Sequence, residues 1–141
     1  VKDCWPEAPL AAPRREVGYL SDPVRNLSLP LGFHITAPEA DEIIGPGEEL
    51  AMGPVLWRTL DTAGHPPGGL SFYCREAEVV ITGDALFADG IGRTDIPGAV
   101  EATLLANIRQ NLLTLPEATR VLPGHGPPST VGEELRSNPF L

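Results

Sequence analysis

The sequence has little cysteine, almost no lysine and no long apolar run. Its two cysteines, Cys4 and Cys74, lie far apart without a Cys-x-x-Cys spacing. This argues against a disulfide framework or a cysteine-rich zinc site and predicts two unpaired thiols. Lysine occurs once, at Lys2, and the formal net charge is −9 at pH 7. Because nucleic acids attract basic surfaces, a chain this acidic is not expected to bind them.

The sequence also shows no pattern of a membrane-spanning segment or of a secretion signal. No apolar run approaches the roughly 18 residues that are needed to cross a bilayer. The first residues do not show the basic stretch followed by an apolar stretch that marks a signal peptide. We therefore expect a cytoplasmic protein without a membrane partner.

The chain's 141 residues suffice for one compact domain with a real core, and we predict a single domain over residues 1–141. Residues 1–40 carry six prolines. Since proline lacks a backbone donor and disfavours helix at the residue before it, this segment is predicted to be loop with one short helix near residues 14–20. Sheet and helices are predicted over residues 48–141.

Four strands are predicted in the first part of this region. Residues 49–52 and 55–60 flank a Gly-Pro break, which is typical of a tight turn between two strands. Residues 70–74 alternate between apolar and polar, which predicts a half-exposed strand. Residues 78–82 form a continuous apolar run, which predicts a central strand that is buried on both faces.

Beyond residue 98 the apolar period changes to that of a helix. Residues 100, 104, 108 and 112 are apolar, which predicts an amphipathic helix over residues 100–115 that ends before Pro116. A short strand follows at residues 120–122, and the pair Thr130 and Glu133 has the spacing of a capping box for a last helix that ends near Ser137. This order of elements predicts a layered α/β fold, with its core between the helix at 100–115 and the strand at 79–82.

Three side chains that can ligate metals follow predicted strands directly. His65 lies in a glycine- and proline-rich turn after the strand at 55–60, Asp84 follows the strand at 78–82, and His125 follows the strand at 120–122. Sites in α/β proteins form where strands end, and imidazole and carboxylate are ligands for zinc, iron and manganese. Each residue alone also fits an ordinary turn, so the prediction depends on their combination. His34, the third histidine, is predicted to be a loop residue.

Five segments together resemble one family. Residues 62–68, 82–87, 90–98, 122–127 and 138–141 are similar to the C-terminal half of the metallo-β-lactamase-fold hydrolases, and among these to the hydroxyacylglutathione hydrolase (glyoxalase II)-like group. The similarity extends from about Ser21 to Leu141. It implies an α/β fold that is the C-terminal half of an αββα sandwich, with one β-sheet layer and flanking helices.

The resemblance also implies roles for four residues. His65 matches the ligand that completes one metal centre, His125 the ligand that completes a second, and Asp84 the catalytic carboxylate that bridges two zinc or iron ions. Arg93 matches a basic residue that faces the anionic part of the substrate in some members. A complete member would use a metal-bound hydroxide to attack a small-molecule acyl thioester.

The family's His-x-His-x-Asp-His motif does not occur in this sequence. The chain therefore offers three ligands for two ions, and by itself we expect it to bind metal weakly or not at all and to be inactive. A fragment, a truncated chain and a functional half-domain all remain open. So do two alternatives to the thioester hydrolase, namely a persulfide dioxygenase with one iron and a non-catalytic binding or assembly module.

An uncovered sheet layer would also need a partner. The predicted strands carry apolar side chains that a second layer normally covers, namely Leu56, Trp57, Leu70 and Phe72. Exposed apolar surface of this kind promotes association. We therefore expect self-association, or pairing with the N-terminal half of the fold.

Overall fold

The computed structural model describes residues 4–141, which divide into two compact units, one ending at Ile44 and the other spanning Gly45–Leu141. The first unit contains a helix, α1 (Val17–Ser21), and a two-stranded parallel sheet of β1 (Ala11–Pro13) and β2 (Glu42–Ile44). Most of it is loop, as its prolines predict. No helix in the described part of the chain combines the length and the apolar character that crossing a membrane requires.

The long loop of the first unit is held by polar side chains instead of by regular pairing. The amide nitrogen of Asn26 donates to the carbonyls of Tyr19 and Ile35, over 3.1 and 2.9 Å. The Ser28 hydroxyl accepts from the backbone N–H of Ile35 at 3.2 Å. Because backbone groups need hydrogen-bond partners, these two side chains supply bonds that strand pairing would otherwise provide.

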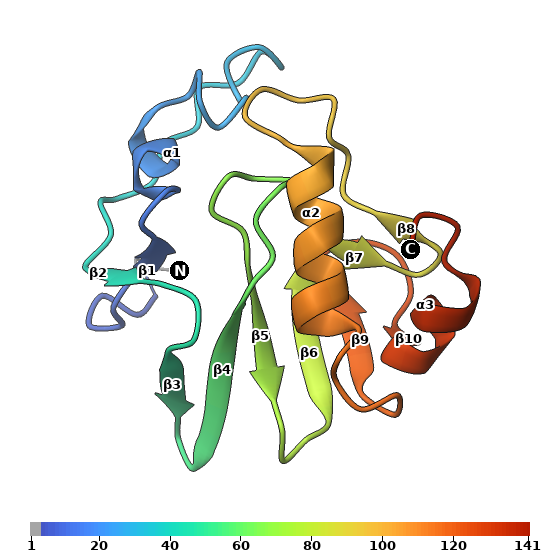
Figure 1. Cartoon of the computed structure of the whole chain (residues 1–141). Helices are drawn as coiled ribbons and strands as arrows, with labels where there is room; N and C mark the ends of the chain where they lie inside the picture. The colour runs from blue at the N-terminus through green and yellow to red at the C-terminus, as the bar shows by residue number, and fades with distance from the viewer. Residues whose placement is uncertain (1–3) are drawn as a thin grey trace. The chain divides into compact units, whose positions relative to one another are not determined.

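The second unit is built on one six-stranded sheet (Figure 1) with the strand order β10-β9-β6-β5-β4-β3. Neighbouring strands are antiparallel except for β6 and β9, which are parallel. The strands are β3 (Glu49–Met52), β4 (Val55–Asp61), β5 (Leu70–Cys74), β6 (Val79–Gly83), β9 (Arg120–Pro123) and β10 (Ser129–Thr130). The α/β fold class is confirmed.

The connection from β6 to β9 carries the remaining elements. A small hairpin of β7 (Leu86–Phe87) and β8 (Gly90–Ile91) comes first, and the helix α2 (Glu101–Asn107) follows. Directly after α2 the chain widens into a turn of π-helix, η1 (Ile108–Leu112). The last helix, α3 (Val131–Ser137), follows β10.

The core lies between the helical segment and one face of the sheet. Leu104, Ile108 and Leu112 are fully buried together with Val80 of β6 and Val121 of β9. Their spacing of four residues places them on one side of the helix. The helix and the strand that the sequence predicts as the core are therefore the ones that form it.

The predicted helix over residues 100–115 needs correction at both ends. Val100 lies outside the helix as its N-cap, with extended backbone (φ −142°, ψ 104°) and 51% of its surface exposed, and its backbone N–H donates to the carbonyl of Gly64 at 2.7 Å. At the other end the segment is π-helical from Ile108 to Leu112. A hydrophobic period cannot reveal such a local widening.

The central strand β6 is buried on both faces at its start, as predicted, since Val79 on the face opposite Val80 is only 8% exposed, but the burial does not extend to Ile81. Val80 is fully buried, whereas Ile81, which points to the other face, is 38% exposed. Its cross-strand neighbour on that face is Phe72, which is partly exposed. The helices of this unit pack on the face of Val80, so the opposite face keeps contact with solvent.

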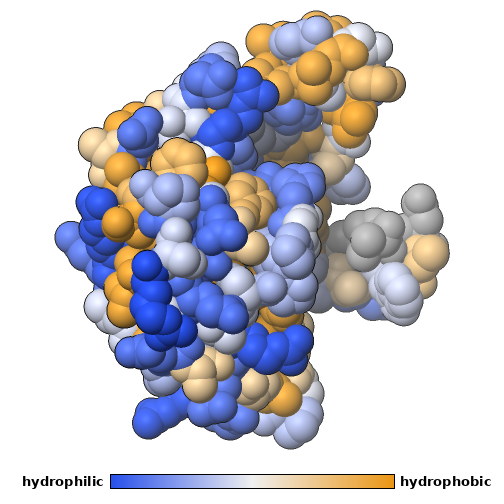
Figure 2. Space-filling model, turned by 90° about the vertical axis from the view of Figure 1, so that its right-hand side faces the viewer, coloured by the Kyte–Doolittle hydropathy of each residue, from blue (hydrophilic) through white to orange (hydrophobic). Residues whose placement is uncertain are grey.

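The capping box of the last helix is confirmed. The Thr130 hydroxyl accepts from the backbone N–H of Glu133 at 3.2 Å, and the Glu133 carboxylate accepts from the backbone N–H of Thr130 at 2.8 Å. One turn on, the buried carboxylate of Glu134 accepts from the N–H of Asp89 at 3.0 Å and from the Asn138 side chain at 2.8 Å. The bond from Asp89 attaches α3 to the turn between β7 and β8. The face drawn in Figure 2 carries many hydrophilic residues with apolar ones between them.

Candidate metal centre

The directions of three strands bring the candidate ligands to one edge of the sheet. β4 and β6 run the same way, since each is antiparallel to β5, and β9 is parallel to β6. Their C-terminal ends therefore share an edge, which is where α/β sheets place ligands. His65 follows β4, Asp84 follows β6 and His125 follows β9.

Asp84 lies between the two histidines. One of its oxygens, Oδ2, is 3.7 Å from Nε2 of His65 and 3.4 Å from Nε2 of His125. The His65 side chain is largely buried, with 17% of its surface exposed, whereas that of His125 is 77% exposed. The cluster is therefore open to solvent on the side of His125. His34 is an exposed loop residue of the first unit.

The ring of His65 is oriented by a backbone carbonyl. Its Nδ1 lies 2.7 Å from the carbonyl oxygen of Arg93. A carbonyl can only accept, so Nδ1 carries the proton in this contact. In the neutral ring the lone pair is then on Nε2, the atom that faces Asp84. Histidines that ligate metals are commonly fixed in this way through their other nitrogen.

Two glycines permit the close packing around Asp84. A β-carbon at Gly124 would collide with Oδ1 of Asp84. A β-carbon at Gly92 would collide with the backbone oxygen of Asp84 and lie 2.8 Å from Cβ of His65. The sequence predicts turns at these glycines, but the space that they leave for Asp84 is visible only in the structure.

The turn that carries His65 is held by the helix above it. The Asn107 side chain donates to the carbonyl of Ala63 at 3.0 Å, and the Asn111 side chain donates to the carbonyl of Asp61 at 2.9 Å. Neither asparagine was predicted from the sequence. Their spacing of four residues, which places both on one side of a helix, was the available indication.

Arg93 lies beside the cluster through its backbone, while its side chain is paired with Asp95. The guanidinium donates from Nε and Nη2 to the two carboxylate oxygens of Asp95, over 2.7 and 2.8 Å. This bidentate hydrogen bonding, together with the opposite charge, raises the pKa of Arg93 and lowers the pKa of Asp95. Both side chains are more than half exposed. Asp95 was not predicted, although it follows Arg93 by only two positions.

The donor types of the cluster fit zinc or iron, but the donor number does not complete a site. Among residues 4–141, no three or more His, Cys, Asp and Glu side chains form a group that could hold a metal ion. A closed site generally needs four ligands around one ion. A carboxylate between two histidines instead fits a bridge, with each histidine serving a different ion. The metal-ligand roles of His65, Asp84 and His125 stay a prediction.

Comparison with known proteins gives the family. Residues 5–125 match the family model described as the metallo-beta-lactamase superfamily, and the chain belongs to that superfamily. Its relatives include the probable metallo-hydrolase YqgX of Bacillus subtilis, 46% identical over 142 residues that cover 100% of this chain and 67% of YqgX. Hydroxyacylglutathione hydrolase GloC of Haemophilus influenzae is 44% identical over 95 residues, 67% of this chain and 45% of GloC. The predicted family resemblance is confirmed.

Solved structures agree with this assignment. A B3 metallo-beta-lactamase, BLEG-1, superposes with a TM-score of 0.94 at 39% identity, covering 99% of this chain and 68% of BLEG-1. A di-iron form of TTHA1623 has a TM-score of 0.85 at 34% identity, covering 96% and 66%. ETHE1 from Myxococcus xanthus has a TM-score of 0.69 at 26% identity, covering 96% and 64%. The chain thus spans about two thirds of the length of these proteins.

Proposed function

We propose that this chain is part of a metal-dependent hydrolase of small acyl thioesters. The observation that carries the proposal is the placement of two imidazole nitrogens around one carboxylate oxygen, with the ring of His65 fixed by the Arg93 carbonyl. The similarity to a hydroxyacylglutathione hydrolase supports the thioester as substrate. The di-iron form of TTHA1623 supports two metal ions as the cofactor.

In this proposal the residues of the chain hold the metal ions and orient the substrate. Zinc or iron, when bound, would make a water molecule acidic enough to attack the thioester at neutral pH. His65 and His125 would each hold one ion, and the negative charge of Asp84 would offset the repulsion between two cations that lie close together. Arg93 would bind the anionic part of the substrate, which would take the place of Asp95 on the guanidinium. An exposed ion pair is weak, which permits such an exchange.

The number of metal ions separates this proposal from its main alternative. Persulfide dioxygenases use a single iron, and the similarity to the ETHE1 structure supports that reading. A site that is completed around one ion would leave Asp84 without a second ion to bridge. The third reading, a non-catalytic module, is supported by the incomplete donor set of residues 4–141.

The test compares the 141-residue chain with a longer protein that also carries the family's His-x-His-x-Asp-His motif. We expect about two metals per longer chain by elemental analysis, together with hydrolysis of S-lactoylglutathione, and neither property in the short chain. Asp84→Asn should lower metal occupancy in the longer protein and activity as a consequence. Asp22→Asn, in a carboxylate of the first unit whose side chain is 42% exposed, should change neither.

Three results would contradict the proposal. One iron per chain with oxidation of a persulfide would favour the dioxygenase. Two metals with turnover of a β-lactam and no thioesterase activity would exclude the proposed substrate. Full activity in the 141-residue chain would show that the site needs no further ligands.

A further inference from the structure

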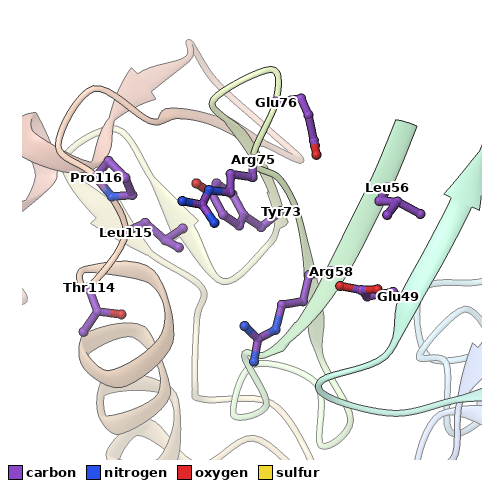
Figure 3. A pocket seen from close by; sticks show the side chains of 9 residues that line it. All are labelled: Glu49, Leu56, Arg58, Tyr73, Arg75, Glu76, Thr114, Leu115 and Pro116. Carbon is purple, nitrogen blue, oxygen red and sulfur yellow. The ribbon is translucent and has the colours of Figure 1, made fainter. Parts of the chain in front are cut away.

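A cavity of about 500 Å³ lies on the helix-packed face of the sheet, and none of its lining residues is a metal-ligand candidate (Figure 3). It is bounded by the beginning of β4, the end of β5 and the residues after η1. Because β4 and β5 are antiparallel, the beginning of β4 and the end of β5 lie at the sheet edge opposite to the one with His65 and Asp84. The residues that line the cavity are Glu49, Leu56, Arg58, Tyr73, Arg75, Glu76, Thr114, Leu115 and Pro116.

Two arginines supply the positive charge of this cavity. Arg58 pairs in register with Tyr73 across β4 and β5, so their side chains share a face of the sheet, and Arg75 follows β5 directly. In Figure 3 both arginine side chains extend toward the side on which Leu115 lies.

Neither guanidinium is neutralised within the part of the chain that the structure describes. Arg25, Arg93 and Arg136 each form an ion pair with a carboxylate. No ion pair or side-chain hydrogen bond involves Arg58 or Arg75 among residues 4–141. Their donors are therefore available to a ligand, and guanidinium groups bind carboxylate and phosphate oxygens with two parallel bonds.

Two carboxylates also line the cavity, and neither forms an ion pair with Arg58 or Arg75 among the described residues. Glu76 accepts a hydrogen bond from the thiol of Cys74, with 3.7 Å between the sulfur and the oxygen, and within residues 4–141 it forms no ion pair with either arginine. Glu49 lies opposite Arg58 in the ladder of β3 and β4, but the two do not form an ion pair. The lining thus holds two positive and two negative side chains, and neither carboxylate is ion-paired with a guanidinium among the described residues.

The other walls are apolar or aromatic. Tyr73 and Leu115 are partly buried against the hydrophobic core, and Leu56, which is 46% exposed, adds an apolar rim. A volume of this size is typical of pockets for small molecules. We propose that this cavity binds a small organic anion, whose carboxylate or phosphate group is held by Arg58 and Arg75 and whose aromatic or apolar part packs against Tyr73 and Leu115.

The test uses nuclear magnetic resonance titrations of the metal-free, 141-residue chain at constant ionic strength. Phenyl phosphate and benzoate are the two anionic probes, and phenol is the neutral probe of the same shape. We expect shifts of the backbone amides at residues 73–76 and 113–115 with at least one anion, which also tells phosphate from carboxylate. Phenol should bind at least tenfold more weakly.

Matched variants make the result specific. Arg58→Gln and Arg75→Gln should each weaken the anion about tenfold, because each removes a charged pair of donors, while Arg58→Lys should keep part of the affinity. Arg120→Gln is the control, since Arg120 is an exposed arginine on β9 outside the cavity. Circular dichroism establishes that every variant is folded. No binding of either anion, equal binding of phenol, an equal effect of Arg120→Gln, or shifts confined to the turn of His125 would each overturn the proposal.

Discussion

Asp95 decides whether the charge of Arg93 is available to an incoming anion. The two side chains are joined by two hydrogen bonds of 2.7 and 2.8 Å at the surface. Ion pairs this exposed contribute little to stability and are weakened by salt. Under the proposed function, an anionic group of the substrate would therefore displace Asp95 from Arg93 at little cost.

The titration of Asp95 provides the first prediction. Its pKa should lie below the ordinary value of 3.8, because Arg93 hydrogen-bonds and stabilises the charged form. Carbon-detected resonance titration should show this in the wild-type chain and a return toward 3.8 in Arg93→Gln. Since the folded-state pKa is lowered, the pair stabilises the fold above about pH 4 and loses this effect as the pH falls through the folded-state value. Identical titration in both proteins would contradict the pairing.

Gly124 provides the second prediction at this scale. A methyl group there would collide with Oδ1 of Asp84, so Gly124→Ala should push the carboxylate away from the two imidazoles and lower the free energy of unfolding by about 1 to 3 kcal/mol. Urea denaturation measures the loss, and imidazole resonances report the displacement. Gly90→Ala is the control, because its added carbon would meet atoms no closer than 3.8 Å. Equal stability of the two variants would show that the site can relax.

At the scale of elements, the segment of α2 and η1 forms the core with the sheet. Leu104 is fully buried, so Leu104→Ala should lower the free energy of unfolding by about 2 to 5 kcal/mol through lost burial and a residual cavity. Leu135→Ala on α3, where the side chain is 52% exposed, should change it by less than about 0.5 kcal/mol. Thermal or urea denaturation of both variants tests the expectation. A Leu104→Ala chain as stable as the control would contradict the burial.

The strands that could be predicted are those that carry their own period. β3, β4, β5 and β6 are joined by short connections, and their side-chain patterns show them within one or two residues of the observed bounds. The parallel pair of β1 and β2 was not predicted, because its three residues on each strand are too few to show a period and their partner lies far along the chain. The widening at η1 depends on packing that no pattern of apolar residues encodes.

The same distinction applies to the candidate centre. His65, Asp84 and His125 could be found because each follows a strand and its flanking residues are characteristic of the family. Asn107 and Asn111 could not, since their role depends on which loop the helix faces. Contacts that join a helix to a loop of another connection are set by tertiary packing, which local sequence does not specify.

At the scale of the whole molecule, apolar side chains of the sheet remain exposed. Met52 is 59% exposed and Ile81 38%. We propose that the isolated chain self-associates through this sheet, because burying such side chains removes apolar area from water. Light scattering should show a mass above 15.0 kDa that rises with concentration.

A matched pair of charged variants locates the surface. Ile81→Lys should weaken the association. Leu135→Lys, in α3 instead of the sheet, should leave it unchanged. Both variants should keep the wild-type circular dichroism spectrum. A particle of constant monomeric mass at high concentration would exclude the association, and equal effects of the two lysines would place it elsewhere.

The bonds from the helix to the turn of His65 join residues that are far apart in the chain. Asn107 is 44 positions from Ala63, and Asn111 is 50 positions from Asp61. The hairpins of β3 to β6 close over much shorter loops, which is faster because less chain entropy is lost. We therefore expect the turn of His65 to reach its final conformation only when α2 docks, late in folding. A metal ion that binds there would act mainly on the rate of unfolding and leave the first collapse of the chain unchanged.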